Sequence, residues 1–139
     1  MQAMPSFDDA TTTAASAEEV WKALYDPARY PSWWVGWATV EPDGDDTFTM
    51  YPVGYPDFPM PQQLRTDGDG HRVLVSCLVS DLVFEWHLEP LDDGTRIAVH
   101  VELPEEEAHR LESQRGVVSA SLRSLAALAA ATDEPPARG

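Results

Sequence analysis

The chain has 139 residues, of which 24 are acidic and 9 are basic, so its formal net charge is -15 at pH 7. This length suits one domain with a hydrophobic core and is too short for two ordinary domains. The charge disfavours binding to nucleic acid or to an anionic membrane, and no stretch approaches the roughly 20 apolar residues of a membrane span. We therefore expect a cytoplasmic protein with one domain over residues 1–131 and a disordered tail over residues 132–139.

The first predicted elements are a strand over residues 7–13 and two short helices. Three consecutive threonines favour the strand. Ser16 and Glu19 have the spacing of a capping box, which starts a helix. Pro27 disfavours a helical conformation at Asp26, so the first helix ends there. The same Asp-Pro pair can begin a second helix as its N-cap and first residue.

Three tryptophans follow this helix pair. The second helix should end near Pro31, and Trp33, Trp34 and Trp37 come directly after it. Each indole can bury about 150–250 Å² of surface. Large aromatic side chains gathered just past a helix end form either a plug in the core or the wall of a pocket.

A series of strand-like runs comes next, separated by turn sequences rich in Gly, Pro and Asp. They cover residues 38–41, 47–51, 62–67, 71–79, 82–89 and 95–103. Neighbours joined by such short loops must be antiparallel. For the last two runs, a loop over residues 91–94 places Glu89 opposite Arg96. The same register sets Glu85 against His100, and facing opposite charges favour it.

The C-terminal part predicts one long helix, from Pro104 to about Ala131. Proline followed by three glutamates is a good helix start. An apolar stripe at the helical period follows, made of Leu111, Val118, Leu122, Leu125 and Ala129. Gly116 interrupts the helix, where it marks either a close approach or a space for a ligand, or is only a tolerated weak point.

The order of these elements resembles the SRPBCC superfamily. Three motifs carry the resemblance, namely AEEVWKALYDPARYPSWW, FEWHLEPLDDGTRIAVHVEL and SLRSLAAL, and it covers about residues 6–131. The superfamily includes START lipid-transfer domains, birch-pollen-allergen-like proteins and the polyketide cyclase/dehydrase group. The resemblance implies an α+β helix-grip fold, in which a curved antiparallel sheet of six to seven strands wraps around the C-terminal helix, with two short helices after the first strand. It also implies a cavity between the sheet and that helix.

The predicted walls of this cavity come from several elements and are mainly apolar. Residues 51–61 are too rich in proline for a central strand, yet they carry aromatic side chains, so we expect them to fold over the opening as a lid. In the alternative, Phe58 and Met60 only cap the core. The expected ligand-binding residues are Trp33, Trp37, Tyr51, Phe58, Met60, Gln62, Leu64, Phe84, Trp86, Val99, Leu111, Arg115, Val118 and Leu122.

Catalysis has little support from sequence motifs. The chain contains no Gly-rich phosphate loop, no metal-ligand spacing and no nucleophile elbow, so we expect no cofactor and no metal. Cys77 is the single cysteine and lies in an apolar run, which predicts a buried structural residue. The candidates for proton transfer are Tyr51, His100 and Arg115, although a surface pair of His100 with Glu85 is favoured over a general base.

We therefore expect a protein, monomeric or homodimeric, that binds a small apolar or aromatic molecule such as a polyketide, fatty acid or isoprenoid. One alternative is a polyketide aromatase/cyclase or dehydratase, whose cavity folds a reactive chain. Another is a protein-interaction module of the chaperone-regulator type, with an exposed aromatic patch. The sequence leaves open the ligand, the cavity volume and the strand phase at Ser76.

Overall fold

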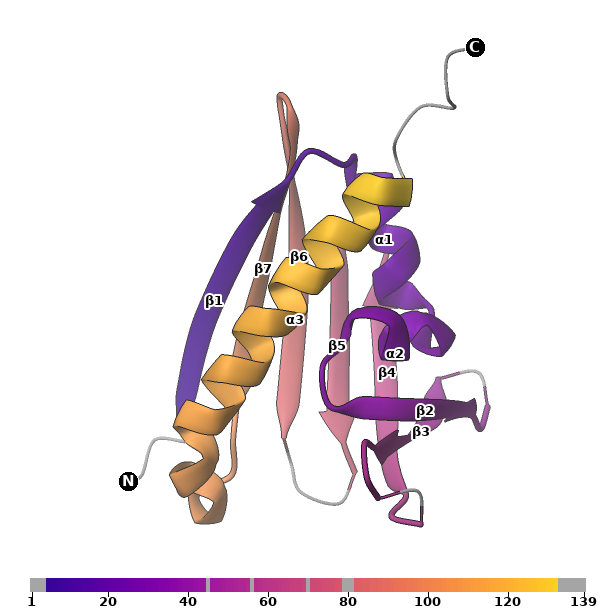
Figure 1. Cartoon of the computed structure of the whole chain (residues 1–139), viewed down its shortest axis with the longest axis vertical. Helices are drawn as coiled ribbons and strands as arrows, with labels where there is room; N and C mark the ends of the chain where they lie inside the picture. Colours follow the sequence, from indigo (N-terminus) through magenta and orange to yellow (C-terminus); the bar gives the residue numbers. More distant parts are fainter. Residues whose placement is uncertain (1–4, 45, 56, 70, 79–81, 133–139) are drawn as a thin grey trace.

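A computed structural model describes residues 5–44, 46–55, 57–69, 71–78 and 82–132. Its sheet is antiparallel and has seven strands in the order β1-β7-β6-β5-β4-β3-β2 (Figure 1). The strands are β1 (Ser6–Thr13), β2 (Trp37–Pro42), β3 (Thr47–Pro52), β4 (Met60–Asp67), β5 (Arg72–Cys77), β6 (Val83–Leu91) and β7 (Gly94–Glu102). Residues 133–139 of the expected tail lie outside the described residues.

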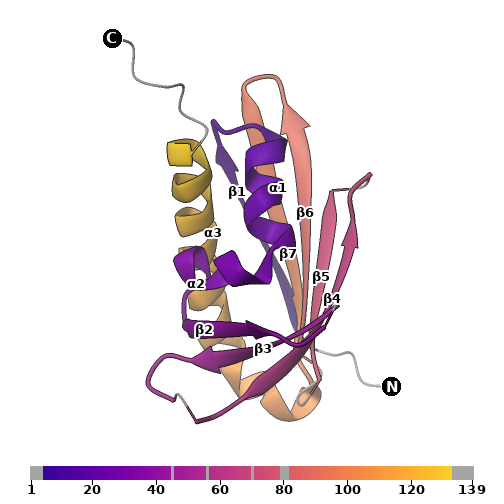
Figure 2. The ribbon, with the colours of Figure 1, turned by 90° about the vertical axis from the view of Figure 1, so that its right-hand side faces the viewer.

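The helices all cover one face of this sheet (Figure 2). They are α1 (Ala17–Tyr25), the 3-10 turn η1 (Pro27–Arg29), α2 (Tyr30–Trp33), the 3-10 segment η2 (Glu105–Arg110) and α3 (Leu111–Thr132). The long α3 crosses the sheet diagonally, and the β2–β3 end of the sheet curls towards α2. The α+β helix-grip architecture is therefore confirmed. Among the described residues, no helix is both long and apolar enough to cross a bilayer.

The helix pair begins as its sequence predicts. The Ser16 hydroxyl accepts a hydrogen bond from the N–H of Glu19, and the Asp26 carboxylate accepts one from the N–H of Ala28. The second helix does not end near Pro31, however. This proline lies in the first turn of α2, where its missing N–H costs little, and the helix continues to Trp33.

The register of β6 and β7 is the predicted one, with Glu89 opposite Arg96 and Glu85 opposite His100. The expected contact between the side chains of Glu85 and His100 is wrong, because each side chain bonds to a different residue. Closer carboxylates take that place: His100 bonds to Asp8 on the neighbouring strand β1, at 2.8 Å, and to Glu102 on its own strand β7, at 3.0 Å. Glu85 instead lies 3.8 Å from a guanidinium nitrogen of Arg72 on β5.

The turn from β6 to β7 packs tightly on the end of β1. A Cβ atom at Gly94 would lie 2.0 Å from the carbonyl oxygen of Thr13, so only glycine fits there. The Thr13 hydroxyl donates to the carbonyl of Ala126 on α3, at 2.9 Å. The Thr95 hydroxyl donates to the carbonyl of Ala15, at 2.8 Å. These contacts fix the first strand to both β7 and α3.

The stripe predicted for the last helix faces the sheet. Four of its members, Val118, Leu122, Leu125 and Ala129, are buried, and Leu111 is half-buried against the core. The helix itself starts at Leu111, since residues 105–110 form 3-10 turns.

Two open questions of the sequence are also answered by the packing. Val75 and Cys77 are buried, which puts Ser76 on the outer face of β5.

Gly116 is exposed, and a Cβ there would meet no atom within 4 Å. Neither a close approach nor a space for a ligand explains this glycine, which is a tolerated weak point of the helix.

Candidate functional site

A cluster of large aromatic side chains fills the space between α2 and the inner face of the sheet. The Trp33 ring stacks on the Trp34 ring, with centroids 5.4 Å apart. Trp86, from β6, meets both rings edge to face, at 5.1 Å and 5.2 Å. We call this group, with Tyr30, Phe48 and Phe84, the aromatic cluster.

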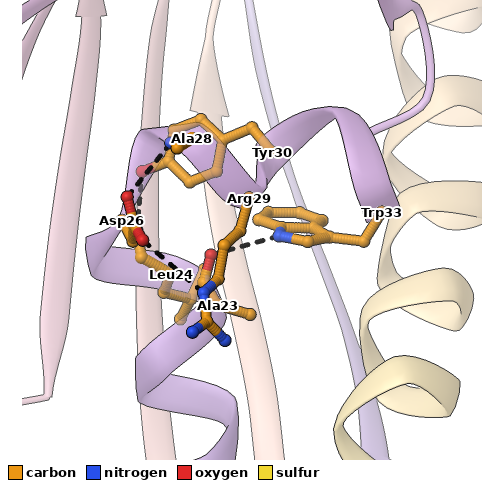
Figure 3. Close-up of polar contacts among 7 residues, drawn as sticks. All are labelled: Ala23, Leu24, Asp26, Ala28, Arg29, Tyr30 and Trp33. Atoms are coloured by element: carbon orange, nitrogen blue, oxygen red, sulfur yellow. Dashed lines mark hydrogen bonds and ion pairs between the residues drawn. The ribbon is translucent and has the colours of Figure 1, made fainter. Parts of the chain in front are cut away.

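Hydrogen bonds to the preceding helix hold the cluster in place (Figure 3). The Trp33 Nε1 donates to the carbonyl of Ala23, at 3.1 Å, and the Tyr30 hydroxyl donates to the carbonyl of Leu24, at 2.6 Å. Burial, with a smaller contribution from Asp26, raises the pKa of Tyr30 far above its ordinary value. Tyr30 therefore stays protonated and serves as a structural donor.

Beside this cluster lies an apolar pocket of about 620 Å³. It is formed where α2, β2 and the N-terminal part of α3 come together with the loop that joins β3 to β4. Its lining residues are Trp34, Val35, Gly36, Trp37, Pro52, Tyr55, Phe58, Met60, Leu82, Phe84, Glu107, Arg110, Gln114 and Val117. Most of these side chains are apolar, which suits a small hydrophobic ligand.

The rim of the apolar pocket differs from its interior. Tyr55 and Phe58, on the β3–β4 loop, are 65% and 57% exposed, and Val35, between α2 and β2, is 42% exposed. Apart from the Tyr55 hydroxyl, its polar side chains come from the helix side, where Arg110 lies 3.4 Å from Glu107 on η2. An apolar ligand could therefore cover these aromatic surfaces while a polar end stays near the ion pair.

The structure places four of the predicted ligand-binding residues in this pocket: Trp37, Phe58, Met60 and Phe84. Seven others are buried in the core behind it, namely Trp33, Gln62, Leu64, Trp86, Val99, Val118 and Leu122, and Leu111 packs at the edge of that core. The reason is that aromatic side chains occupy the depth between the sheet and α3. The pocket is thus shallower than the expected cavity.

The remaining predicted residues lie elsewhere. Tyr51 alternates with the buried Met50, so it faces away from the pocket, and its hydroxyl is 3.2 Å from a carboxylate oxygen of Glu41. Arg115 is on the exposed side of α3, with its guanidinium 5.3 Å from the centre of the Phe7 ring.

The predicted lid is shorter than the proline content suggested. Strand β3 runs to Pro52 and β4 begins at Met60, so Pro52 and Pro61 lie within strands near the end of a hairpin. The connecting loop covers residues 53–59. Its exposed aromatic side chains, Tyr55 and Phe58, do line the pocket.

The third catalytic candidate, His100, lies on the outer face of the sheet, as its strand phase predicts. Hydrogen bonds with Glu102 and Asp8 raise the pKa of this imidazole. The three candidates Tyr51, His100 and Arg115 therefore share no site with one another or with the apolar pocket. In the described ranges, no group of three or more His, Cys, Asp or Glu side chains is arranged to hold a metal ion.

The expected list of ligand-binding residues lacks several residues of the pocket lining. Leu82 was missed altogether, whereas Trp34 and Tyr55 were expected only within the tryptophan group and the lid. For the lining residues near the C-terminal helix, the sequence does contain a usable signal, which is their helical spacing. Arg110, Gln114 and Val117 are spaced by four and three residues, so they form a second face next to the buried stripe of α3. For Trp34 no local signal separates it from Trp33, because both follow the same helix start.

Comparison with known proteins agrees with this architecture. The sequence model of the family described as "Polyketide cyclase / dehydrase and lipid transport" matches residues 4–131. No curated protein sequence matches the chain.

Several solved structures share the fold. The Zhui aromatase/cyclase from Streptomyces sp. R1128 is 18% identical, with a TM-score of 0.74 over 91% of this chain and 94% of that one. The di-domain ARO/CYC BexL from the BE-7585A biosynthetic pathway is 14% identical, with a TM-score of 0.75 over 89% of this chain and 46% of that one. Ara h 8.0201 is 13% identical, with a TM-score of 0.69 over 93% and 99%.

Proposed function

Because the chain belongs to the polyketide cyclase/dehydrase and lipid-transport family, we propose that it binds a small apolar or aromatic molecule in the apolar pocket beside α2. The observation that carries this proposal is a mainly apolar pocket of about 620 Å³. Small-molecule sites have volumes of roughly 300–1,000 Å³ and similar linings. A polyketide, fatty acid or isoprenoid has the required apolar surface, and the cytoplasmic location expected from the sequence is part of the proposal.

Binding explains the exposed aromatic groups at the pocket mouth. Tyr55 and Phe58 present large apolar surfaces to water, which is unfavourable unless something covers them. A ligand seated between this loop and Trp37 would bury part of both surfaces. Burial of apolar area contributes about 25 cal/mol per Å², so a ligand that covers these rings gains substantial affinity.

A cyclase or dehydratase of the same family is the second candidate, favoured by the fold shared with two aromatase/cyclases. Such a reaction needs an acid and a base within reach of the substrate. The ionisable groups on the described pocket lining are Tyr55, Glu107 and Arg110, and the last two already form an ion pair. Proton transfer would therefore fall to Tyr55 or Glu107, and binding without chemistry is the simpler function.

Fluorescence titration with the neutral dye N-phenyl-1-naphthylamine tests the proposal, since an uncharged dye avoids repulsion by a chain of net charge -15. The matched variants are Val35→Asp, on the rim of the pocket, and Leu91→Asp, outside it. These side chains are 42% and 41% exposed, so both changes should be tolerated by the fold.

We expect saturable binding by the wild type and by Leu91→Asp, and loss of most of it in Val35→Asp, because an apolar dye that covers this rim position would have to desolvate the new carboxylate. Equal affinity in all three proteins, or no saturable binding in any, overturns the proposal. In the second case the exposed aromatic patch becomes a candidate protein-interaction surface.

A further inference from the structure

The aromatic cluster contains one polar atom that its own surroundings leave unsatisfied. Among the described residues, the only buried side-chain nitrogen or oxygen without a hydrogen-bond partner is the Nε1 of Trp86. Trp86 is fully buried. An indole N–H is a donor only, and buried donors in proteins almost always have an acceptor.

The neighbours of Trp86 explain why no acceptor is at hand. Across the sheet it stands between Val73 on β5 and Val99 on β7. On the helix-covered face of the sheet it meets the rings of Trp33 and Trp34 edge to face. These four side chains offer no oxygen to the indole.

Trp86 is also close to the apolar pocket. Phe84 lines the pocket and precedes Trp86 by two residues on the same face of β6, which corresponds to a distance along the strand of roughly 7 Å. Trp34 lines the pocket as well and packs on both of these residues, with ring centroids 4.8 Å from Phe84 and 5.2 Å from Trp86. The Trp34 ring is therefore in contact with both the pocket and Trp86.

The backbone of Trp34 is fixed, and its ring, which is only 2% exposed, belongs to the inner wall of the apolar pocket. Its N–H donates to the carbonyl of Tyr30, at 2.7 Å, and the N–H of the next residue, Val35, donates to the hydroxyl of Ser121, at 2.9 Å. A change of side-chain rotamer needs no movement of these bonds. Such a change would take the ring away from its contact with Trp86 and would deepen the pocket towards that residue.

We propose that Trp86 is a specificity-determining residue, whose indole N–H donates to an uncharged oxygen acceptor at the leading end of the ligand once the Trp34 ring has turned aside. The ligand class is then an apolar or aromatic molecule that carries a carbonyl at the end that enters first. This inference rests on the proposed function, since it requires a ligand in the apolar pocket. It adds the polar group by which that ligand is chosen.

Two ligands of the same shape test this assignment, 2-acetylnaphthalene, which has a carbonyl oxygen, and 2-isopropylnaphthalene, which has a methyl group in its place. We expect the indole N–H resonance of Trp86, in ¹H–¹⁵N spectra of the wild type, to move downfield with the ketone and not with the hydrocarbon. The resonances of Trp34 and Trp37 should respond to both ligands, because both occupy the pocket. The same Trp86 shift with both ligands, or none with either, overturns the inference.

Affinities provide a second readout. The ratio of the two dissociation constants should change by roughly two- to tenfold in favour of the hydrocarbon in Trp86→Phe, which keeps an aromatic ring but has no donor. An unchanged ratio contradicts a role for the N–H. If Trp86→Phe fails to fold, the wild-type spectra still decide. Failure of the proposed function looks different, since neither ligand would then shift Trp34 or Trp37.

Discussion

The N–H of Val53 donates a hydrogen bond to the carbonyl oxygen of Gly36, 2.9 Å away. This bond joins the first residue of the β3–β4 loop to the segment between α2 and β2. Both segments line the apolar pocket, so the loop starts from a fixed point beside Trp37. The aromatic side chains further along the loop are therefore held over the pocket from that end.

The first prediction concerns this loop. Phe58→Ala should weaken the binding of N-phenyl-1-naphthylamine by roughly three- to tenfold, because a ring at the pocket mouth no longer covers the dye. Phe58 is 57% exposed, so the midpoint of urea unfolding should hardly change. The control is Tyr25→Ala, which removes an aromatic ring that is 45% exposed and lies outside the pocket lining. Equal affinities of the two variants would show that the loop takes no part in binding.

The second prediction concerns the support of the aromatic cluster. Trp33→Phe should lower the free energy of unfolding by about 2–4 kcal/mol, because it leaves a space in the core and removes the donor from the buried carbonyl of Ala23. Trp21→Phe is the matched change at a half-buried site against Tyr25 and His71, where we expect a smaller loss. Urea denaturation of both variants measures the difference. A loss at Trp33 no larger than at Trp21 contradicts the structural role given to this bond.

A pair of glycines gives the third prediction, since the same substitution should have opposite effects. Gly116→Ala should stabilise the protein by about 0.5–1 kcal/mol, because the site is exposed, helical and free of neighbours. Gly94→Ala should destabilise it by more than that, because the new methyl group collides with the backbone of Thr13. Thermal unfolding tests both variants. Stabilisation by Gly94→Ala would mean that the end of β1 is not packed as described.

The fourth prediction is a pH dependence at His100. Its hydrogen bonds to Glu102 and Asp8 raise the pKa of the folded state above the ordinary value of about 6.5. The protonated ring therefore stabilises the fold below pH about 6.5, and this contribution is lost as the pH rises through the raised pKa. Glu85 on β6 also faces this position and adds negative charge.

The comparison of wild type with His100→Gln measures this effect. At pH 6 the melting temperature of the variant should be lower than that of the wild type, and this difference should be smaller at pH 8.5. The difference should be small, since the site is partly exposed and exposed ion pairs contribute little. A difference that is the same at both pH values would argue against a charged His100 in this network.

Much of the fold could be predicted because facing charges and the regular spacing of apolar residues specify it directly. The register of β6 and β7 follows from the charges at Glu89 and Arg96, and the buried face of α3 follows from spacings such as that of Val118 and Leu122. These patterns repeat along an element, so single misplaced residues do not obscure them.

The candidate site was harder to predict because a core wall and a pocket wall have the same apolar pattern. Phe84 and Trp86 share one face of β6, yet only Phe84 reaches the pocket. Their difference depends on Trp34, which comes from a distant part of the chain and fills the depth between sheet and helix. Tyr51 was misplaced for a simpler reason, since its neighbour Met50 takes the inward position on β3.

The most direct test of ligand binding in the apolar pocket uses the five tryptophans of the chain as reporters. Their indole N–H signals in a ¹H–¹⁵N spectrum, assigned with single Trp→Phe variants, are followed while N-phenyl-1-naphthylamine is added. The account predicts saturable shifts at Trp34 and Trp37, which line the pocket, and none at Trp21, which packs against Tyr25 and His71. Shifts at Trp21 alone, or uniform small shifts that do not saturate, would contradict it.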